Sequence, residues 1–160
     1  MPSTHTSTTA RRPSATVPST TDPATERRDL KRKIELITKI RDHETFNAIE
    51  YYDPYPYQKR FHDTGANCHQ RLLMAGNRIG KSHSGSFETA CHLLGKYPTW
   101  WEGKRFRKPI VAWVGGVSNE TVRDICQFAL LGTPGNPMEL GTGMIPRHAI
   151  TKTERKPGVP

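Results

Sequence analysis

The chain has 160 residues, of which 34% are hydrophobic and 24% charged, and this length suits one domain or part of one. Its formal net charge of +9 favours a polyanionic partner such as nucleic acid or nucleotide, although the charge is also compatible with a purely solubilising role. No apolar run approaches the length needed to span a bilayer, and the polar start is not a secretory signal, so we expect neither a membrane protein nor a secreted one.

The first segment, residues 1–21, consists mostly of Ser, Thr and Pro and is predicted to be a disordered tail. Asp22 and Pro23 are typical of a helix start, and the helix is expected over residues 24–47. Leu30, Ile34 and Ile37 fall on one face of it at helical spacing. Many Lys and Arg residues make this helix basic. Its basic residues could contact DNA, or they could simply face solvent.

The next elements alternate between predicted strands and predicted helices. The short apolar run at residues 71–75 predicts a buried strand, and residues 81–94 predict a helix that Gly95 caps. A second buried strand is expected at residues 110–114, followed by a helix from Ser118 or Asn119 to residue 131. This order predicts an α/β fold, in which a parallel sheet has helices on its faces.

The three cysteines, Cys68, Cys91 and Cys126, are odd in number and far apart. Their spacing suggests neither a disulfide framework nor a zinc ribbon. A reducing compartment is therefore expected, and Cys68 and Cys91, each followed by a histidine, are expected to be buried small hydrophobic residues rather than metal ligands.

A phosphate-binding loop lies between the first predicted strand and the helix after it. It reads Ala75-Gly76-Asn77-Arg78-Ile79-Gly80-Lys81-Ser82 and fits the pattern G-x-x-x-x-G-K-[S/T], with alanine at the first position. Backbone N–H groups of such a loop, with the helix N-terminus, form a nest for phosphate. Lys81 would neutralise the β- and γ-phosphates of ATP, and the Ser82 hydroxyl would be a ligand of Mg²⁺. The sequence therefore predicts a nucleotide site.

Arg78 lies within this loop, and its role has two interpretations. Its guanidinium could stabilise charge on the γ-phosphate as an arginine finger in cis, or it could pair with a carboxylate and brace the loop.

Several segments together resemble the large terminase subunit of tailed bacteriophages. They are Tyr55-Pro56-Tyr57-Gln58, the phosphate loop, the Trp100-Trp101-Glu102-Gly103 stretch, and Gly116-Val117-Ser118-Asn119-Glu120-Thr121. The resemblance covers roughly residues 51–150. It implies a partial P-loop NTPase domain of the ASCE type at residues 49–160, preceded by the basic helix at 22–48 and the tail at 1–21.

The resemblance also implies roles for residues and partners. Gln58 would read the adenine, with Tyr55 or Tyr57 stacked on the base. The residues alone favour a proline-tyrosine turn that covers the core, and the resemblance reverses this preference. The family's basic loop residue corresponds to Arg78. The implied intact protein works in the host cytoplasm as an oligomeric ring. It hydrolyses ATP with Mg²⁺, moves double-stranded viral DNA into the procapsid, cuts the concatemer, and binds the small terminase subunit and the portal protein.

The chain departs from the family's pattern in one respect. The family carries a second acidic strand motif and a C-terminal nuclease domain, and neither is found before Pro160. The expectation is an N-terminal fragment that hydrolyses ATP very slowly alone. Two other functions compete: a helicase- or recombinase-type ATPase fragment, and a non-catalytic DNA-binding or assembly module resting on the basic helix and on Lys104, Arg105, Arg107 and Lys108.

Overall fold

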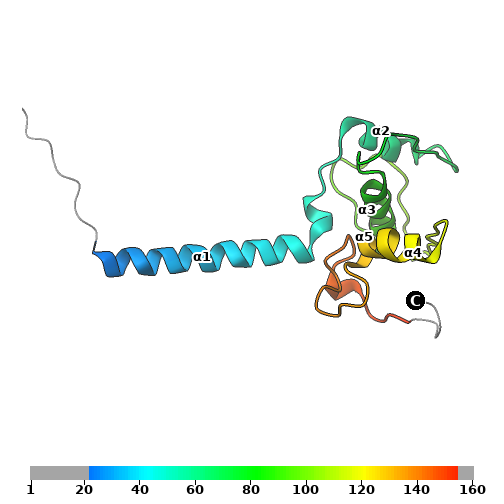
Figure 1. Cartoon of the computed structure of the whole chain (residues 1–160). Helices are drawn as coiled ribbons and strands as arrows, with labels where there is room; N and C mark the ends of the chain where they lie inside the picture. The colour runs from blue at the N-terminus through cyan, green and yellow to red at the C-terminus, as the bar shows by residue number, and fades with distance from the viewer. Residues whose placement is uncertain (1–21, 155–160) are drawn as a thin grey trace, which may run out of the picture. The chain divides into compact units, whose positions relative to one another are not determined.

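The computed structural model describes residues 22–154, and the predicted tail at 1–21 lies outside them. The chain divides into two units, Met1–Leu36 and Ile37–Pro160. The described part is helical (Figure 1). Its helices are α1 (Pro23–Phe46), α2 (Pro56–Thr64), α3 (Lys81–Leu94), α4 (Asn119–Thr121) and α5 (Phe128–Leu131). Two short 3₁₀ helices, η1 (Ala48–Tyr51) and η3 (Arg147–Ala149), and a π-helical turn, η2 (Val122–Gln127), complete the order.

The predicted α/β fold is wrong, because residues 22–154 contain no strand and no sheet. Both apolar runs expected to be buried strands are irregular and largely exposed. Leu72 and Met74 are 79% and 80% exposed, and Val111 and Trp113 are 86% and 95% exposed. A strand exists only through hydrogen bonds to a neighbouring strand, and neither run pairs with another in the described chain. A short apolar run therefore did not suffice to predict a strand.

The predicted helices, in contrast, are confirmed by α1, by α3 and by the continuous segment from α4 to α5. At the start of α1 the Asp22 carboxylate accepts a hydrogen bond from the backbone N–H of Ala24 at 3.2 Å. Gly95 ends α3 in the left-handed conformation, with φ 65°. The Ser118 hydroxyl accepts from the Thr121 N–H at 3.2 Å and so caps α4. Hydrogen bonds of Asp22 and Ser118 thus fix two helix starts, and the backbone conformation of Gly95 ends α3.

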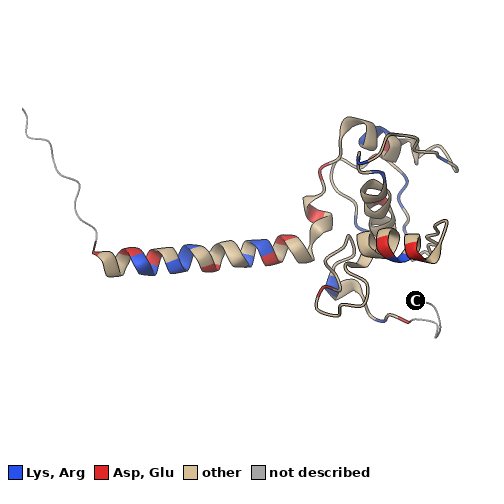
Figure 2. Cartoon of the chain, viewed as in Figure 1, with Lys and Arg blue, Asp and Glu red and all other residues tan. Residues whose placement is uncertain are grey.

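Helix α1 has no buried residue, and Leu30, Ile34 and Ile37 are each more than half exposed. Figure 2 shows acidic residues interspersed among the basic ones along the helix. The helix therefore presents a mixed surface rather than the uniformly basic one that its Lys and Arg content suggested. No described helix is long and apolar enough to cross a membrane.

The core of the second unit forms around α3. Phe87, Ala90 and Cys91 on one face of α3 are buried together with Trp101 and Met144. Tyr52 stacks on Phe87 with ring centroids 3.9 Å apart. Helix α3 also packs against α5 and η2. The core thus fixes the helix that begins immediately after the predicted phosphate loop.

The cysteines differ in environment, so the expectation of burial is confirmed for Cys91 and wrong for Cys68. Cys91 is fully buried, Cys126 is intermediate and Cys68 is exposed in the turn after α2. Burial, with a smaller contribution from the Glu88 charge, raises the pKa of the Cys91 thiol to about 12.

We therefore expect a thiol-reactive disulfide reagent to label Cys68 rapidly in the native chain and to leave Cys91 unreacted, because only a thiolate attacks the reagent. Mass spectrometry of peptides after timed labelling checks this result. Equal labelling of both residues in the folded protein would contradict the burial of Cys91.

Candidate functional site: the phosphate loop and its support

The predicted phosphate loop leads directly into α3. Residues 71–76 have no regular structure, and a turn follows at Asn77 and Arg78. Gly80 adopts the left-handed conformation, with φ 80° and ψ 21°, and its carbonyl accepts the hydrogen bond from Ser84 N–H that opens the helix. A non-glycine residue rarely adopts this backbone conformation, so Gly80 permits the turn from loop to helix.

Lys81 folds back over the loop. Its Nζ donates to the carbonyl oxygens of Ala75 at 2.7 Å and of Gly76 at 2.5 Å. A Cβ atom built on Gly76 would meet nothing within 4 Å, so the space beside this part of the loop is open. The open loop therefore lies next to both the lysine ammonium and the N-terminus of a 14-residue helix. Cationic and N–H donor groups of this kind suit an anionic ligand such as phosphate.

Two further predicted residues lie on the exposed side of the loop. Ser82, in the first turn of α3, is exposed and lines a cavity of about 340 Å³ together with Asp124 of η2. Arg78 is exposed with φ 61°, and it forms no ion pair with any carboxylate in residues 22–154. The bracing ion pair considered for Arg78 is therefore not seen in the described chain.

Tyr57 and Gln58 lie beneath the loop on α2, a helix that the sequence did not reveal. The Tyr57 hydroxyl donates to the carbonyl oxygen of Ile79. Gln58 is only 3% exposed, and its Nε2 lies 3.3 Å from the carbonyl oxygens of both Ile79 and Gly80. Its Oε1 accepts from Tyr55 N–H at 2.9 Å. The resemblance drew attention to these two residues for base recognition, and the structure places both against the loop backbone.

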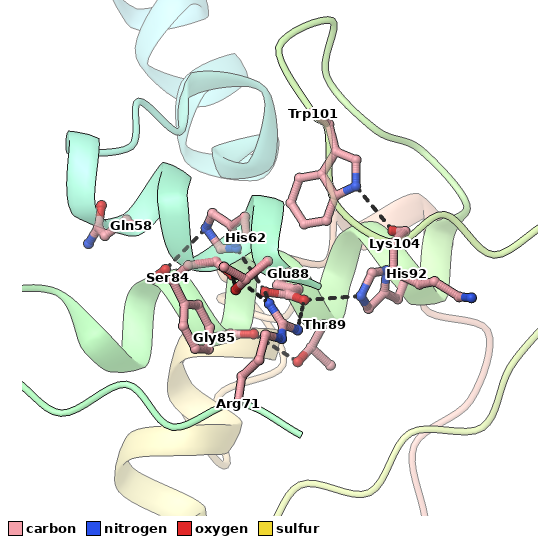
Figure 3. Close-up of polar contacts among 12 residues, drawn as sticks. Gln58, His62, Arg71, Ser84, Gly85, Glu88, Thr89, His92, Trp101 and Lys104 are labelled. Carbon is pink, nitrogen blue, oxygen red and sulfur yellow. Dashed lines mark hydrogen bonds and ion pairs between the residues drawn. The ribbon is translucent and has the colours of Figure 1, made fainter. Parts of the chain in front are cut away.

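A buried polar cluster connects α2, α3 and the segment before the loop (Figure 3). Its centre is the Glu88 carboxylate on α3, which is 6% exposed. His62 of α2 donates from Nδ1 to Glu88 Oε2 at 2.8 Å, and the Arg71 guanidinium pairs with the same carboxylate. His92, one turn along α3, lies 3.3 Å from Glu88 Oε1. The name "Glu88 cluster" is used below for Glu88, His62, Arg71 and His92.

The residues around Glu88 stabilise the ionised form of its carboxyl group. Burial by itself would raise the pKa of the carboxyl group. Hydrogen bonds from His62, His92 and Arg71, together with the Arg71 charge, outweigh burial and hold the pKa of Glu88 far below its ordinary value. No sequence motif marked this cluster, since even the hydrogen-bonded pair His62 and Glu88 is separated by 26 positions. The other buried residues of α2 and α3 include polar ones such as Gln58 and Ser84, so His62 and Glu88 did not stand out as polar residues on an apolar helix face.

Comparison with known proteins supports the resemblance. Over 145 residues the chain is 35% identical to the protein named "Terminase, large subunit" of Salmonella phage P22. The chain is a homologue of a terminase large subunit. The similarity covers 81% of this chain and 29% of the phage P22 terminase, so the chain spans less than a third of that relative's length. No protein-family model matches the sequence, and no solved structure matches it.

Proposed function

We propose that this chain carries the ATP-binding loop of a phage terminase large subunit. The observation on which the proposal rests is the conformation of the loop end. Left-handed Gly80 delivers the chain into the N-terminus of α3, and the Lys81 ammonium bridges two carbonyl oxygens of the same loop. Homology to a terminase large subunit supports this assignment.

The residues fit a Mg-ATP ligand at this loop. The backbone of residues 75–80 and the start of α3 would bind the phosphates, with the Lys81 ammonium as the counter-charge. The Ser82 hydroxyl would be a ligand of Mg²⁺, and exposed Arg78 would reach the γ-phosphate. ATP bound with Mg²⁺ supplies a phosphoanhydride bond whose hydrolysis drives mechanical work in motors of this kind.

The intact protein's activity is part of the same proposal. It would hydrolyse ATP to move double-stranded viral DNA into a procapsid in the host cytoplasm, and it would cut the concatemer. Its partners would be the small terminase subunit and the portal protein, and its working form an oligomeric ring.

Within this chain, the segment after Trp101 suits contact with DNA phosphates. Lys104, Arg107 and Lys108 are exposed, and the backbone between them is anchored by Phe106 N–H, which donates to the Tyr97 hydroxyl at 2.8 Å.

Calorimetric titration with Mg-ATP tests the nucleotide site. We expect the wild-type chain to bind Mg-ATP, and the Lys81→Ala variant to lose about a hundredfold in affinity or fall below detection, because charge-assisted hydrogen bonds to phosphate are lost. The matched control is Lys96→Ala, which removes an exposed lysine just beyond the other end of α3 and should bind as wild type does. Equal affinity in wild type and Lys81→Ala would overturn the proposal.

A further inference from the structure

Arg71 attaches the segment before the phosphate loop to the helices around it. Its Nη1 donates to the Phe61 carbonyl oxygen of α2 at 2.7 Å, and its guanidinium donates to both carboxylate oxygens of Glu88 on α3. Its Cζ lies 4.6 Å from the centroid of the Phe61 ring. The planar fork of a guanidinium suits several such contacts at once. Arg71 therefore joins the start of this segment to two helices.

The residues between Arg71 and the loop have no comparable attachment. Residues 72–74 make no hydrogen bond within residues 22–154, and two of the three are exposed. The next contacts along the chain are the hydrogen bonds from Lys81 Nζ to two loop carbonyl oxygens. Lys81 is itself proposed to bind phosphate. Arg71 is thus the attachment on this side of the loop that takes no part in binding the ligand.

The segment is short enough for this attachment to affect the loop. Ala75 is four positions after Arg71, and an extended chain advances by at most about 3.6 Å per residue. At its other end the loop passes through Gly80 directly into α3. The same helix therefore holds both sides of the loop, one through the backbone at Gly80 and the other through the ion pair between Arg71 and Glu88.

We infer that Arg71 is a positioning residue of the phosphate loop, which it holds against α3 through Glu88, although neither side chain belongs to the loop. This inference rests on the proposed nucleotide site. Its consequence has a definite sign. Neutralising Glu88 removes a negative charge near the site, so Coulomb attraction alone would leave polyphosphate binding unchanged or strengthen it. A positioning role requires binding to weaken, because the start of the segment loses its attachment.

Calorimetric titrations of the full chain with Mg-ATP and with Mg-tripolyphosphate provide the test. We expect Glu88→Gln to lower the affinity for both ligands by about tenfold, because the charge-assisted contacts that fix Arg71 are lost. Arg71→Met combined with Glu88→Gln should bind no more weakly than Arg71→Met alone, since both substitutions break the same ion pair. The matched control is Glu102→Gln, which neutralises an exposed carboxylate and should bind as wild type does.

A second variant disturbs Arg71 without changing any charge, and it serves as the test if Glu88→Gln does not fold. In Gly65→Ala the new Cβ would lie 3.0 Å from Arg71 Cζ, from Arg71 Nη1 and from the His62 carbonyl oxygen. Gly65 has φ −60°, which alanine also adopts, so the guanidinium is the neighbour that must move. We expect a smaller loss of affinity, about threefold and equal for the two ligands.

Ala90→Gly controls for stability, because it weakens α3 without contacting Arg71 or the loop, and it should bind as wild type does while it is folded. Unchanged or higher affinity of folded Glu88→Gln would overturn the inference. So would a loss confined to Mg-ATP, or a loss of the same size in Ala90→Gly.

Amide ¹H–¹⁵N spectra of the ligand-free chain provide an independent readout. Glu88→Gln and Gly65→Ala should shift the signals of Ala75 and Gly76, and unshifted signals would contradict a positioning role. If wild type binds neither ligand, the proposed function fails, and the spectra still decide whether the ion pair sets the conformation of the loop.

Discussion

Replacement of Glu88 by glutamine is expected to lower the free energy of unfolding by about 3 kcal/mol near neutral pH, because it removes the charged partner of a buried pair. The substitution keeps the shape of the side chain but leaves the Arg71 guanidinium, which is 20% exposed, without its carboxylate. It also weakens the hydrogen bond from His62, which is fully buried. Urea unfolding followed by circular dichroism measures the loss.

The same substitution should change how stability depends on pH. The pKa of Glu88 is held below its ordinary value of 4.5 in the folded chain, so protons bind this group more readily after unfolding. Its contribution is therefore fully present above that ordinary value and is lost as the pH falls below it. We expect wild type to lose stability steeply between about pH 5 and pH 3, and Glu88→Gln to lose less over the same range.

Glu102→Gln is the matched control, since the Glu102 carboxylate is 75% exposed and lies 3.8 Å from Lys59. It should change neither the stability near neutral pH nor its slope with pH by much. Parallel stability curves for wild type and Glu88→Gln on acidification would show that the Glu88 cluster does not hold the carboxylate charged.

The second large effect is expected at Phe87, the aromatic residue of α3 on which the core is built. Phe87 is 1% exposed, stacks on Tyr52 and lies 5.8 Å from the Trp100 ring. Phe87→Ala removes these contacts and leaves a cavity between rings that cannot close fully. We expect a loss of about 3–5 kcal/mol in the free energy of unfolding, measured by urea denaturation.

Leu72→Ala provides the comparison for Phe87→Ala. Leu72 is 79% exposed in the irregular segment before the phosphate loop, so its truncation should change stability by less than about 0.5 kcal/mol. If Leu72→Ala lowered the free energy of unfolding as much as Phe87→Ala does, this apolar segment would have to be packed, contrary to its exposure in the structure.

The sequence correctly predicted helix ends that are set by residues close to them along the chain. Asp22 and Ser118 mark helix starts through hydrogen bonds to nearby residues, Gly95 ends α3 through its left-handed backbone, and the helices there were located correctly. Helix α2 was missed because Pro54 and Pro56 were interpreted as a turn. Proline in the first turn of a helix is common, since its missing N–H needs no partner there, and Pro56 was therefore a usable signal.

Features that depend on distant partners were not predictable in this way. Residues 71–75 have a strand-like composition, but a strand requires a pairing partner that composition does not supply. The ion pair between Arg71 and Glu88 joins residues 17 apart with no spacing rule to connect them. Gln58 was singled out by resemblance, yet its contacts with the Ile79 and Gly80 carbonyls follow from the position of α2. The Gly80-Lys81-Ser82 motif thus predicted the location of the candidate site. The contacts that support the site from α2 and from Glu88 could not be predicted from the sequence.

The close approach of Gln58 to Gly80 has a consequence for how the sequence can diverge. A Cβ atom at position 80 would lie 2.8 Å from Gln58 Nε2, so a side chain there would displace the Gln58 amide from the two loop carbonyl oxygens that it contacts. A smaller residue at position 58 would remove this clash, but it would leave the left-handed backbone at position 80 in place, and that backbone still favours glycine. A substitution of Gly80 is therefore costly for two separate reasons, and a second substitution at position 58 relieves only one of them.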